Sequence, residues 1–358
     1  MKHIVLTGGG TAGHVTPNIA LLPALQAAGY EIAYVGSYEG IEKKLIADFN
    51  IPYTGISTGK FRRYLDPKNF SDPFRVMKGF VEARNYLKNY QPDVVFSKGG
   101  FVSVPVVRAA ASLHIPCIIH ESDMTPGLAN KLCIPVAEKV CCNFPETMKN
   151  IPADKAVLTG SPIRAELAQG SKLAGLNMCG FTANKPVIMV IGGSLGAANV
   201  NKAVRDALPK LLEDFQVVHL CGKDKIDNLL LNTPGYKQFE YIKAELKDIF
   251  AMADVVISRA GANAICELLA LKKPNILIPL PAASSRGDQL LNAASFEAQG
   301  YSIVLNEDDI TTNLLVAKVH ELYFNRQNYV DAMSKSHQMD AVKTIMELIN
   351  AAAEKKTN

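Results

Sequence analysis

Three glycine-rich turns are places where this chain could bind a phosphate group. They are Gly8–Gly13, Gly99-Gly100 and Gly192–Gly196, and each follows directly on a short apolar run. A glycine turn between a strand and a helix lets the backbone approach a phosphate closely, and the helix N-terminus adds free N–H groups and a positive dipole end. Three such turns in one chain indicate a nucleotide or diphosphate ligand.

The first turn also has the G-x-G-x-x-G spacing of a dinucleotide site, at Gly8, Gly10 and Gly13. That alternative requires an acidic residue at the end of the second strand, where it would bind the ribose. The second apolar run reaches Ser37 without an acid, and Glu39 comes late. The sequence therefore disfavours a dinucleotide.

Two residues at predicted strand ends could take a proton from a substrate hydroxyl. His14 follows the first turn at once, and Glu121 follows the apolar run Pro116–His120. Ligands of open α/β sheets bind at the carboxyl ends of the strands. We expect His14 as the general base and Glu121 as the second choice; the alternatives are a structural histidine and a loop charge or helix cap. Asp123 could orient a sugar hydroxyl.

The second half and the segment before it hold further polar candidates. Glu267 lies in the early turns of a predicted helix. There it could bind both hydroxyls of a ribose, or it could only stabilise the helix by interacting with the positive end of its dipole. Gln289 and Asn292 are uncharged amides that suit hydroxyl recognition. Arg164 is the candidate cation for a diphosphate, which a guanidinium can bind with two hydrogen bonds. We see no Asp-x-Asp motif and therefore expect no obligatory metal.

Short apolar runs alternate with helical patterns along the chain, and they predict the scaffold. The expected strands of the first half are Lys2–Thr7, Glu31–Val35, Asp93–Phe96, Pro116–His120, Lys139–Cys142 and Ala156–Thr159. Those of the second half are Val187–Ile191, Gln216–Leu220, Phe239–Tyr241, Asp254–Ser258, Asn275–Pro279 and Ser302–Leu305. Continuous Val- and Ile-rich runs are typical of parallel strands covered on both faces. The pattern predicts an α/β protein.

Each half opens with a strand, a glycine turn and a helix, so we expect two doubly wound, Rossmann-like domains that face each other across a cleft. A length of 358 residues fits two domains. We place the N-terminal domain at 1–163 and the C-terminal domain at 164–340. A helix over 341–358 is expected to pack back on the first domain.

Composition limits the class of protein further. A net charge of +4 is far from the bias of a nucleic-acid binder, so none is expected as a partner. The seven cysteines show no CxxC spacing, which is typical of reduced thiols inside the cell. No apolar run approaches the ~18 residues that span a bilayer. We expect a soluble or peripherally attached protein.

Six motifs together resemble one family, the bacterial N-acetylglucosaminyltransferases that make the final lipid-linked peptidoglycan precursor. The matching segments are residues 8–14 (GGGTAGH), 97–103 (SKGGFVS), 120–122 (HES), 160–164 (GSPIR), 192–196 (GGSLG) and 287–292 (GDQLLN). They are collinear and span nearly the whole chain. The resemblance implies the B-type glycosyltransferase fold, with the acceptor domain first and the UDP-sugar domain second.

The resemblance also implies the reaction. N-acetylglucosamine would pass from UDP-N-acetylglucosamine, with inversion and without a further cofactor, to the 4-hydroxyl of undecaprenyl-diphospho-muramoyl-pentapeptide. The implied donor contacts are Thr11, Ala12, Gly13, Arg164, Ser194 and Gln289, with Glu267 at the ribose and Gly99 and Gly100 as further candidates. Two positions depart from the family: Asp123 stands where many members have Asn, and Ala12 replaces a frequent glycine.

A basic and aromatic segment is the candidate for contact with the membrane. It contains Phe61, Arg62, Arg63, Tyr64, Phe74 and Arg75. Apolar side chains with basic neighbours favour an anionic inner membrane surface, here the cytoplasmic face of the inner membrane. An ordinary loop and core helix is the alternative. The alternative functions are an epimerase or hydrolase of the same donor, a diacylglycerol glycosyltransferase, and a nucleotide-sugar-binding module.

Overall fold

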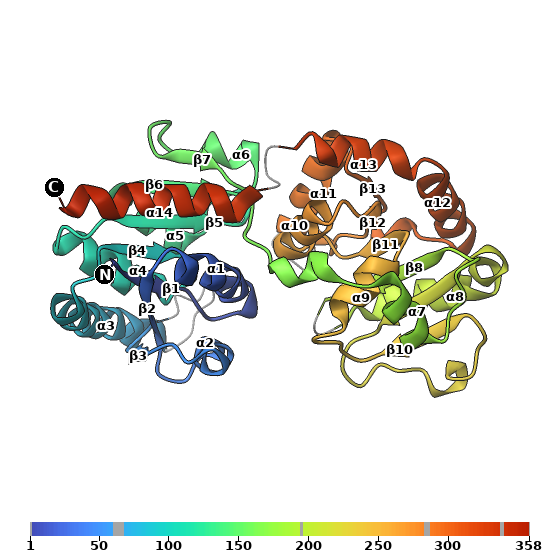
Figure 1. Cartoon of the computed structure of the whole chain (residues 1–358), viewed down its shortest axis with the longest axis horizontal. Coiled ribbons are helices and arrows are strands. Elements are labelled where there is room, and N and C mark those ends of the chain that lie inside the picture. Colours follow the sequence, from blue (N-terminus) through green and yellow to red (C-terminus); the bar gives the residue numbers. More distant parts are fainter. Residues whose placement is uncertain (1, 60–67, 194–195, 283–286, 337–339, 358) are drawn as a thin grey trace. The chain divides into compact units, whose positions relative to one another are not determined.

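The computed structural model describes residues 2–59, 68–193, 196–282, 287–336 and 340–357. By its contacts the chain divides into two compact units. The first comprises residues 1–164 and 340–358, and the second comprises residues 165–339. Each unit is built on one parallel sheet with helices on its faces (Figure 1).

The first unit has a seven-stranded sheet in the order β3-β2-β1-β4-β5-β6-β7. Its strands are β1 (Lys2–Thr7), β2 (Tyr30–Ser37), β3 (Tyr53–Ile56), β4 (Val94–Ser97), β5 (Cys117–Glu121), β6 (Lys139–Cys142) and β7 (Ala156–Leu158). Thr7, the last residue of β1, is in register with Val35 of β2 and Ser97 of β4. The winding reverses between β1 and β4, and such a switch point is where ligands bind in open α/β sheets.

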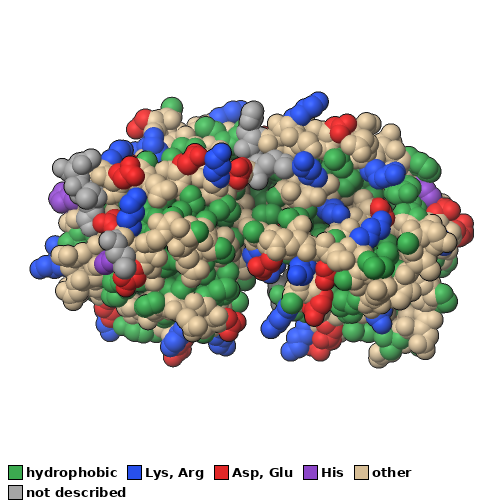
Figure 2. Space-filling view, in the orientation of Figure 1, with side chains coloured by type: hydrophobic (Ala, Val, Ile, Leu, Met, Phe, Trp, Pro, Cys, Tyr) green, Lys and Arg blue, Asp and Glu red, His purple; other side chains and the backbone are tan. Residues whose placement is uncertain are grey.

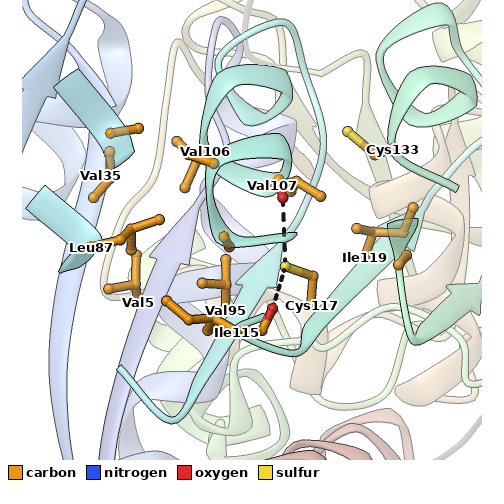
Figure 3. Close-up of a cluster of buried hydrophobic side chains, with 14 of the residues drawn as sticks. Val5, Val35, Leu87, Val95, Val106, Val107, Ile115, Cys117, Ile119 and Cys133 are labelled. Carbon is orange, nitrogen blue, oxygen red and sulfur yellow. Dashed lines mark hydrogen bonds between the residues drawn. The ribbon is translucent and has the colours of Figure 1, made fainter. Parts of the chain in front are cut away.

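Helices cover both faces of this sheet because alternate strand residues point to opposite sides. Ile4 and Leu6 share one core with α1 (Thr16–Ala27) and α14 (Ala341–Thr357). Val5 lies in the other core, which Figure 3 shows. The remaining helices of the unit are α2 (Ile41–Ile46), α3 (Lys68–Tyr90), α4 (Ser103–Ser112), α5 (Leu128–Cys133) and α6 (Pro145–Met148).

The C-terminal helix α14 returns to the first unit. Ile345 and Ile349 are fully buried against its sheet and α1. Each such side chain contributes about 1.5–3 kcal/mol of burial free energy. Tyr30 Oη also donates a hydrogen bond of 2.8 Å to Asn350 Oδ1. The helix therefore completes one face of the first sheet (Figure 1, red).

The second unit repeats the scheme with six strands in the order β10-β9-β8-β11-β12-β13. They are β8 (Val187–Ile191), β9 (Gln216–Leu220), β10 (Tyr236–Phe239), β11 (Val255–Ser258), β12 (Asn275–Leu277) and β13 (Ser302–Val304). The helices are α7 (Lys172–Cys179), α8 (Ala198–Asp214), α9 (Leu246–Met252), α10 (Ala262–Ala270), α11 (Asp288–Ala298), α12 (Thr312–Phe324) and α13 (Arg326–Ser334). The switch point falls between β8 and β11.

The predicted fold class is confirmed as α/β with two doubly wound parallel sheets. Strand β3 was not predicted, and β10 lies a few residues before its predicted place at Phe239–Tyr241. All seven cysteines are buried free thiols. Among the described helices, none combines the length and the apolar character needed to cross a bilayer. On the face in Figure 2, acidic and basic side chains are interspersed over both units.

Candidate active site

The first glycine turn lies at the switch point of the first sheet and packs tightly against the second glycine turn. Gly9 N–H donates to Gly99 O at 3.4 Å. A Cβ on Gly100 would lie 2.2 Å from Gly9 O, and one on Gly10 would lie 2.4 Å from the Phe101 ring. Distances this short exclude any side chain. Glycine is therefore required here by the close approach of the two turns.

A buried carboxylate holds the first turn in place by accepting hydrogen bonds. Glu42 of α2 is fully buried and accepts hydrogen bonds from Gly10 N at 3.1 Å and Ser37 N at 2.9 Å, as well as from Ser37 Oγ. A Cβ on Gly9 would lie 2.5 Å from Glu42 Cδ. The N–H groups of Gly9 and Gly10 thus go to protein acceptors, which disfavours an anion at these two residues. The exposed residues of the turn are Gly10, Thr11 and Ala12.

His14 ends the short helical turn that follows and is half-buried. Its Nδ1 lies 2.9 Å from Thr11 Oγ1. Burial, and next the charge of Lys98, lower the pKa of His14 to about 4, against the opposing effects of a hydrogen bond to the Gly9 backbone and the charge of Glu42. The imidazole is therefore uncharged at neutral pH and can accept a proton.

A buried cluster lies behind the second glycine turn. Lys98 and His120 are almost completely buried, and Lys98 Nζ donates to His120 Nδ1 at 2.8 Å and to Ser122 Oγ. His120 Nε2 lies 2.9 Å from Gly160 O. Burial, and next the charge of Lys98, hold the pKa of His120 well below its usual value. Sequence reasoning missed this cluster; the signal was a lysine between a buried strand and a Gly-Gly turn.

Glu121 has its oxygens occupied within its own loop. It is 4 % exposed and accepts hydrogen bonds from Asp123 N at 2.9 Å, Gly127 N at 3.0 Å and Asn130 Nδ2 at 2.8 Å. These bonds close the loop that leads into α5. The geometry favours the structural interpretation of Glu121 over its role as a base. Asp123, half-buried, accepts at its backbone oxygen from Thr147 Oγ1 at 3.1 Å.

In the second unit, the glycine turn after β8 has one packed end and one open end. A Cβ on Gly196 would lie 2.0 Å from Cys221 O, whereas one on Gly193 would meet no atom within 4 Å. Gly193 has a positive φ of 86°, which favours glycine. The predicted contact at Ser194 lies outside the described residues.

The N-terminus of α10 adjoins that turn, because β11 is the neighbour of β8. Gly261 precedes the helix with φ −69°, and a Cβ there would meet no atom within 4 Å. Neither conformation nor packing against the described residues requires glycine at this position. Glu267 lies half-buried in the same helix.

The amides of α11 tie this helix to the neighbouring strand ends. Gln289 Oε1 accepts from Leu280 N at 3.1 Å, and Asn292, which is buried, donates from Nδ2 to Ala260 O at 3.1 Å. Arg164 is half-buried at the end of the first unit. The structure therefore brings Glu267, Gln289 and Asn292 to one unit and His14, Glu121 and Asp123 to the other.

An ion pair that the sequence did not reveal lies at the same edge of the second sheet. Arg259, directly after β11, pairs with Glu307, and only 9 % of either side chain is exposed. Arg259 Nη1 also donates to Ile278 O at 3.1 Å and to Pro279 O at 3.2 Å. The pair fixes the turn that leads into α10. Of the described side chains, no three His, Cys, Asp or Glu residues gather as metal ligands would.

Two doubly wound parallel sheets with glycine turns at their switch points are the architecture of the B-type glycosyltransferase fold. Residues 4–142 match the glycosyltransferase family 28 N-terminal domain, and residues 187–349 match the glycosyltransferase family 28 C-terminal domain. The chain belongs to glycosyltransferase family 28.

Named relatives cover the whole length. The UDP-N-acetylglucosamine–N-acetylmuramyl-(pentapeptide) pyrophosphoryl-undecaprenol N-acetylglucosamine transferase of Lachnospira eligens is 65 % identical, over 98 % of this chain and 99 % of that protein. The protein of the same name from Clostridium botulinum strain Hall is 58 % identical, with the same coverage. The crystal structure of MurG from Acinetobacter baumannii has a TM-score of 0.78 at 29 % identity, covering 98 % of this chain and 100 % of that one. The predicted resemblance is confirmed.

Proposed function

We propose that this chain transfers N-acetylglucosamine from UDP-N-acetylglucosamine to the 4-hydroxyl of undecaprenyl-diphospho-muramoyl-pentapeptide. The observation that carries the proposal is the identity of 65 % with the Lachnospira eligens transferase over 98 % of this chain. The product would be the last lipid-linked precursor of peptidoglycan, which places the enzyme in cell wall biogenesis, cell shape and cell division.

His14 is the proposed base. The acceptor oxygen forms a bond to the anomeric carbon while the bond from that carbon to the UDP oxygen breaks, and the configuration inverts. The Nδ1 of His14 lies 2.9 Å from Thr11 Oγ1, and this contact orients the imidazole that would take the hydroxyl proton. A positioned base typically contributes ~10²–10⁴-fold to the rate. A pKa of about 4 makes a weak base, and the negative diphosphate of a bound substrate would raise it.

The second unit, residues 165–339, is the proposed donor domain, and the first unit, residues 1–164 and 340–358, is the proposed acceptor domain. Glu267 would bind the ribose, and Gln289, Ser194 and Arg164 would contact the rest of the donor. The open space at Gly193 and Gly261 supports a close approach of the diphosphate to backbone N–H groups and the helix dipole of α10. These groups offset the charge of departing UDP, so no metal or other cofactor is required.

Helix α3 supports peripheral attachment to the inner face of the membrane. Phe74, Met77 and Val81 are 77 %, 64 % and 52 % exposed, and their spacing places them on one stripe of the helix. Arg75 and Lys78 lie beside this stripe and would bind anionic lipid headgroups. The other predicted membrane residues, Phe61, Arg62, Arg63 and Tyr64, lie outside the described residues.

The test is an assay with radiolabelled UDP-N-acetylglucosamine and lipid-linked muramoyl-pentapeptide. We expect label in the lipid fraction only when the acceptor is present. Label released as free sugar would contradict transfer and support the epimerase or hydrolase. Transfer to diacylglycerol in an acceptor exchange would support the lipid glycosyltransferase, and donor binding without turnover would support a binding module.

A further inference from the structure

Lys98 is a charged residue held inside the first unit. It lies directly after β4 with 1 % of its surface exposed, and its backbone N–H donates to Thr7 O at 2.9 Å. Lysine is almost never fully buried without a partner, because removing an ammonium group from water is costly. The ammonium group of Lys98 therefore requires hydrogen-bond partners inside the protein.

The ammonium group connects three separate segments of the chain. Lys98 Nζ donates to His120 Nδ1 at 2.8 Å, and to Ser122 Oγ in the loop after β5. Because Nδ1 accepts this bond, a neutral His120 carries its proton on Nε2. Nε2 then donates to Gly160 O at 2.9 Å, in the segment that ends at Arg164. One buried charge thus selects the tautomer of His120 and fixes the backbone of a third segment.

Lys98 packs against the turn that carries His14, with Gly8 between them. A Cβ on Gly8 would lie 3.2 Å from Lys98 Cβ and 2.5 Å from His14 O. A Cβ on Gly100 would lie 3.3 Å from His14 Nδ1. Glycine at these positions therefore allows close packing of Lys98 and of the second glycine turn against the segment that carries His14.

Two charges of opposite sign act on His14. Lys98 lowers its pKa, whereas Glu42 raises it. The other titratable groups near this pair are His120 on β5, Cys141 on β6, and Tyr34 and Tyr53, which face Glu42 from β2 and β3. Burial raises the pKa of Cys141 to about 12, raises the pKa of both tyrosines and lowers the pKa of His120, so these four groups are uncharged at neutral pH. Lys98 and Glu42 are therefore the groups that set the local field.

We propose that Lys98 is a positioning residue for sugar transfer: its ammonium group orders His120, Ser122 and the Gly160 segment behind the glycine turns that carry His14. The inference rests on the proposed role of His14 as base. Lys98 is buried, and a charge away from bulk water is screened less than one at the surface.

The experiment compares three variants of the full chain in the transfer assay across pH. Lys98→Met removes the charge and the hydrogen bonds at nearly constant volume, and Lys98→Gln keeps a donor for His120 without the charge. Lys202→Met, at an exposed lysine that pairs with Asp206, is the matched control. We expect kcat to fall about 10–100-fold in Lys98→Met, as for a misplaced reacting group. The acid limb of kcat/KM should move to higher pH in Lys98→Met and Lys98→Gln alike, with a smaller loss of kcat in Lys98→Gln.

An unchanged acid limb in the folded variants would overturn the proposal, as would an unchanged kcat in Lys98→Met. If both variants fail to fold, histidine NMR of the wild-type protein decides: a His14 imidazole that titrates near its ordinary pKa of 6.5 would overturn the proposal, and one near 4 would support it. Failure of the underlying function gives a different result, because the wild-type chain would then transfer no sugar, or His14→Ala would retain full transfer.

Discussion

The glycine turns of the two units are alike in sequence but differ in what their glycines face. In the first unit, a side chain at Gly9, Gly10 or Gly100 would collide with protein atoms at 2.2–2.5 Å. In the second unit, a side chain at Gly196 would also collide, at 2.0 Å, whereas one at Gly193, or at Gly261 before α10, would meet no atom of the described residues within 4 Å. The turns of the first unit are therefore packed at each of these glycines, whereas the turn after β8 is packed at one end and open at the other.

The ionisable groups differ in the same way. In the first unit, four ionisable side chains are buried near the carboxyl ends of the strands: Lys98, His120, Glu42 and Glu121. The predicted contacts of the second unit are half-buried or amide side chains on α10 and α11. Proton transfer requires a controlled electrostatic environment, whereas recognition of a sugar nucleotide requires accessible donors and acceptors. The difference supports a division of base and donor binding between the units.

Replacing His14 tests this division most directly. We expect His14→Ala to lower kcat by ~10²–10⁴-fold, the usual contribution of a positioned base, and to change the affinity for UDP less, because the proposed contacts Glu267 and Gln289 lie in the second unit. Steady-state kinetics and calorimetric titration with UDP would measure the two effects. Glu121→Gln, which alters a carboxylate engaged in its own loop, is the comparison. A larger loss of kcat in Glu121→Gln than in His14→Ala would reverse the assignment.

Acid should destabilise the protein through histidines in both units. The pKa is lowered to about 4 for His14 and to about 3 for His219, mainly by burial, whereas each titrates near 6.5 when unfolded. Below about pH 6.5 the unfolded chain binds more protons than the folded chain. The free energy of unfolding is therefore at its full value above about pH 6.5 and falls as the pH drops towards 4. The loss is at most about 1.4 kcal/mol for each unit of pKa shift.

Urea unfolding at pH 7.5 and pH 5 measures this effect, and hydrogen exchange assigns it to each unit. His120, whose pKa is also lowered, adds to the effect in the first unit. We therefore expect the first unit to lose more protection than the second. Equal free energies of unfolding at the two pH values would contradict the uncharged state of these histidines.

Gly9→Ala examines the packed turn. The new methyl group would lie 2.5 Å from Glu42 Cδ, and overpacking of this kind typically costs about 1–3 kcal/mol. Thermal and urea unfolding would measure the cost, and kcat should fall because the turn carries His14. A variant with wild-type stability would show that the turn can move away from Glu42.

Gly261→Ala is the matched change at the open turn. Its φ of −69° suits alanine and no protein atom is near, so stability should change by no more than about 0.5–1 kcal/mol. If the diphosphate approaches this backbone, KM for the donor should rise about tenfold, which corresponds to 1.4 kcal/mol. Unchanged KM with unchanged stability would remove the donor from the N-terminus of α10.

Two exposed phenylalanines, one in each unit, test the membrane contact. Phe74 on α3 is 77 % exposed and Phe324 on α12 is 74 % exposed. Phe74→Ser should weaken binding to vesicles of anionic lipid roughly tenfold, the loss expected for about 1.4 kcal/mol of apolar contact. Phe324→Ser should not. Co-sedimentation measures both, and equal losses would refute a membrane surface specific to α3.

Most of the scaffold could be predicted because buried parallel strands are continuous apolar runs. The run Lys2–Thr7 predicts β1, and Val187–Ile191 predicts β8, residue for residue. Strand β3 escaped because Tyr53–Ile56 is short, lies at the sheet edge and is mostly half-buried, so its apolar signal is weak. Strand β10 is displaced because Tyr236 and Gln238 alternate with exposed or half-buried residues.

The sequence by itself determined the fold class, the family and the places where chemistry could occur, because apolar periodicity and glycine turns are local properties of the chain. Only the tertiary structure decided which polar side chains form their hydrogen bonds within the protein. Glu121 is engaged by donors up to nine residues away, Lys98 meets a histidine on the neighbouring strand, and Glu42 supports a turn 32 residues earlier. Hydrogen bonds and burial across strands depend on strand order, which no local pattern records.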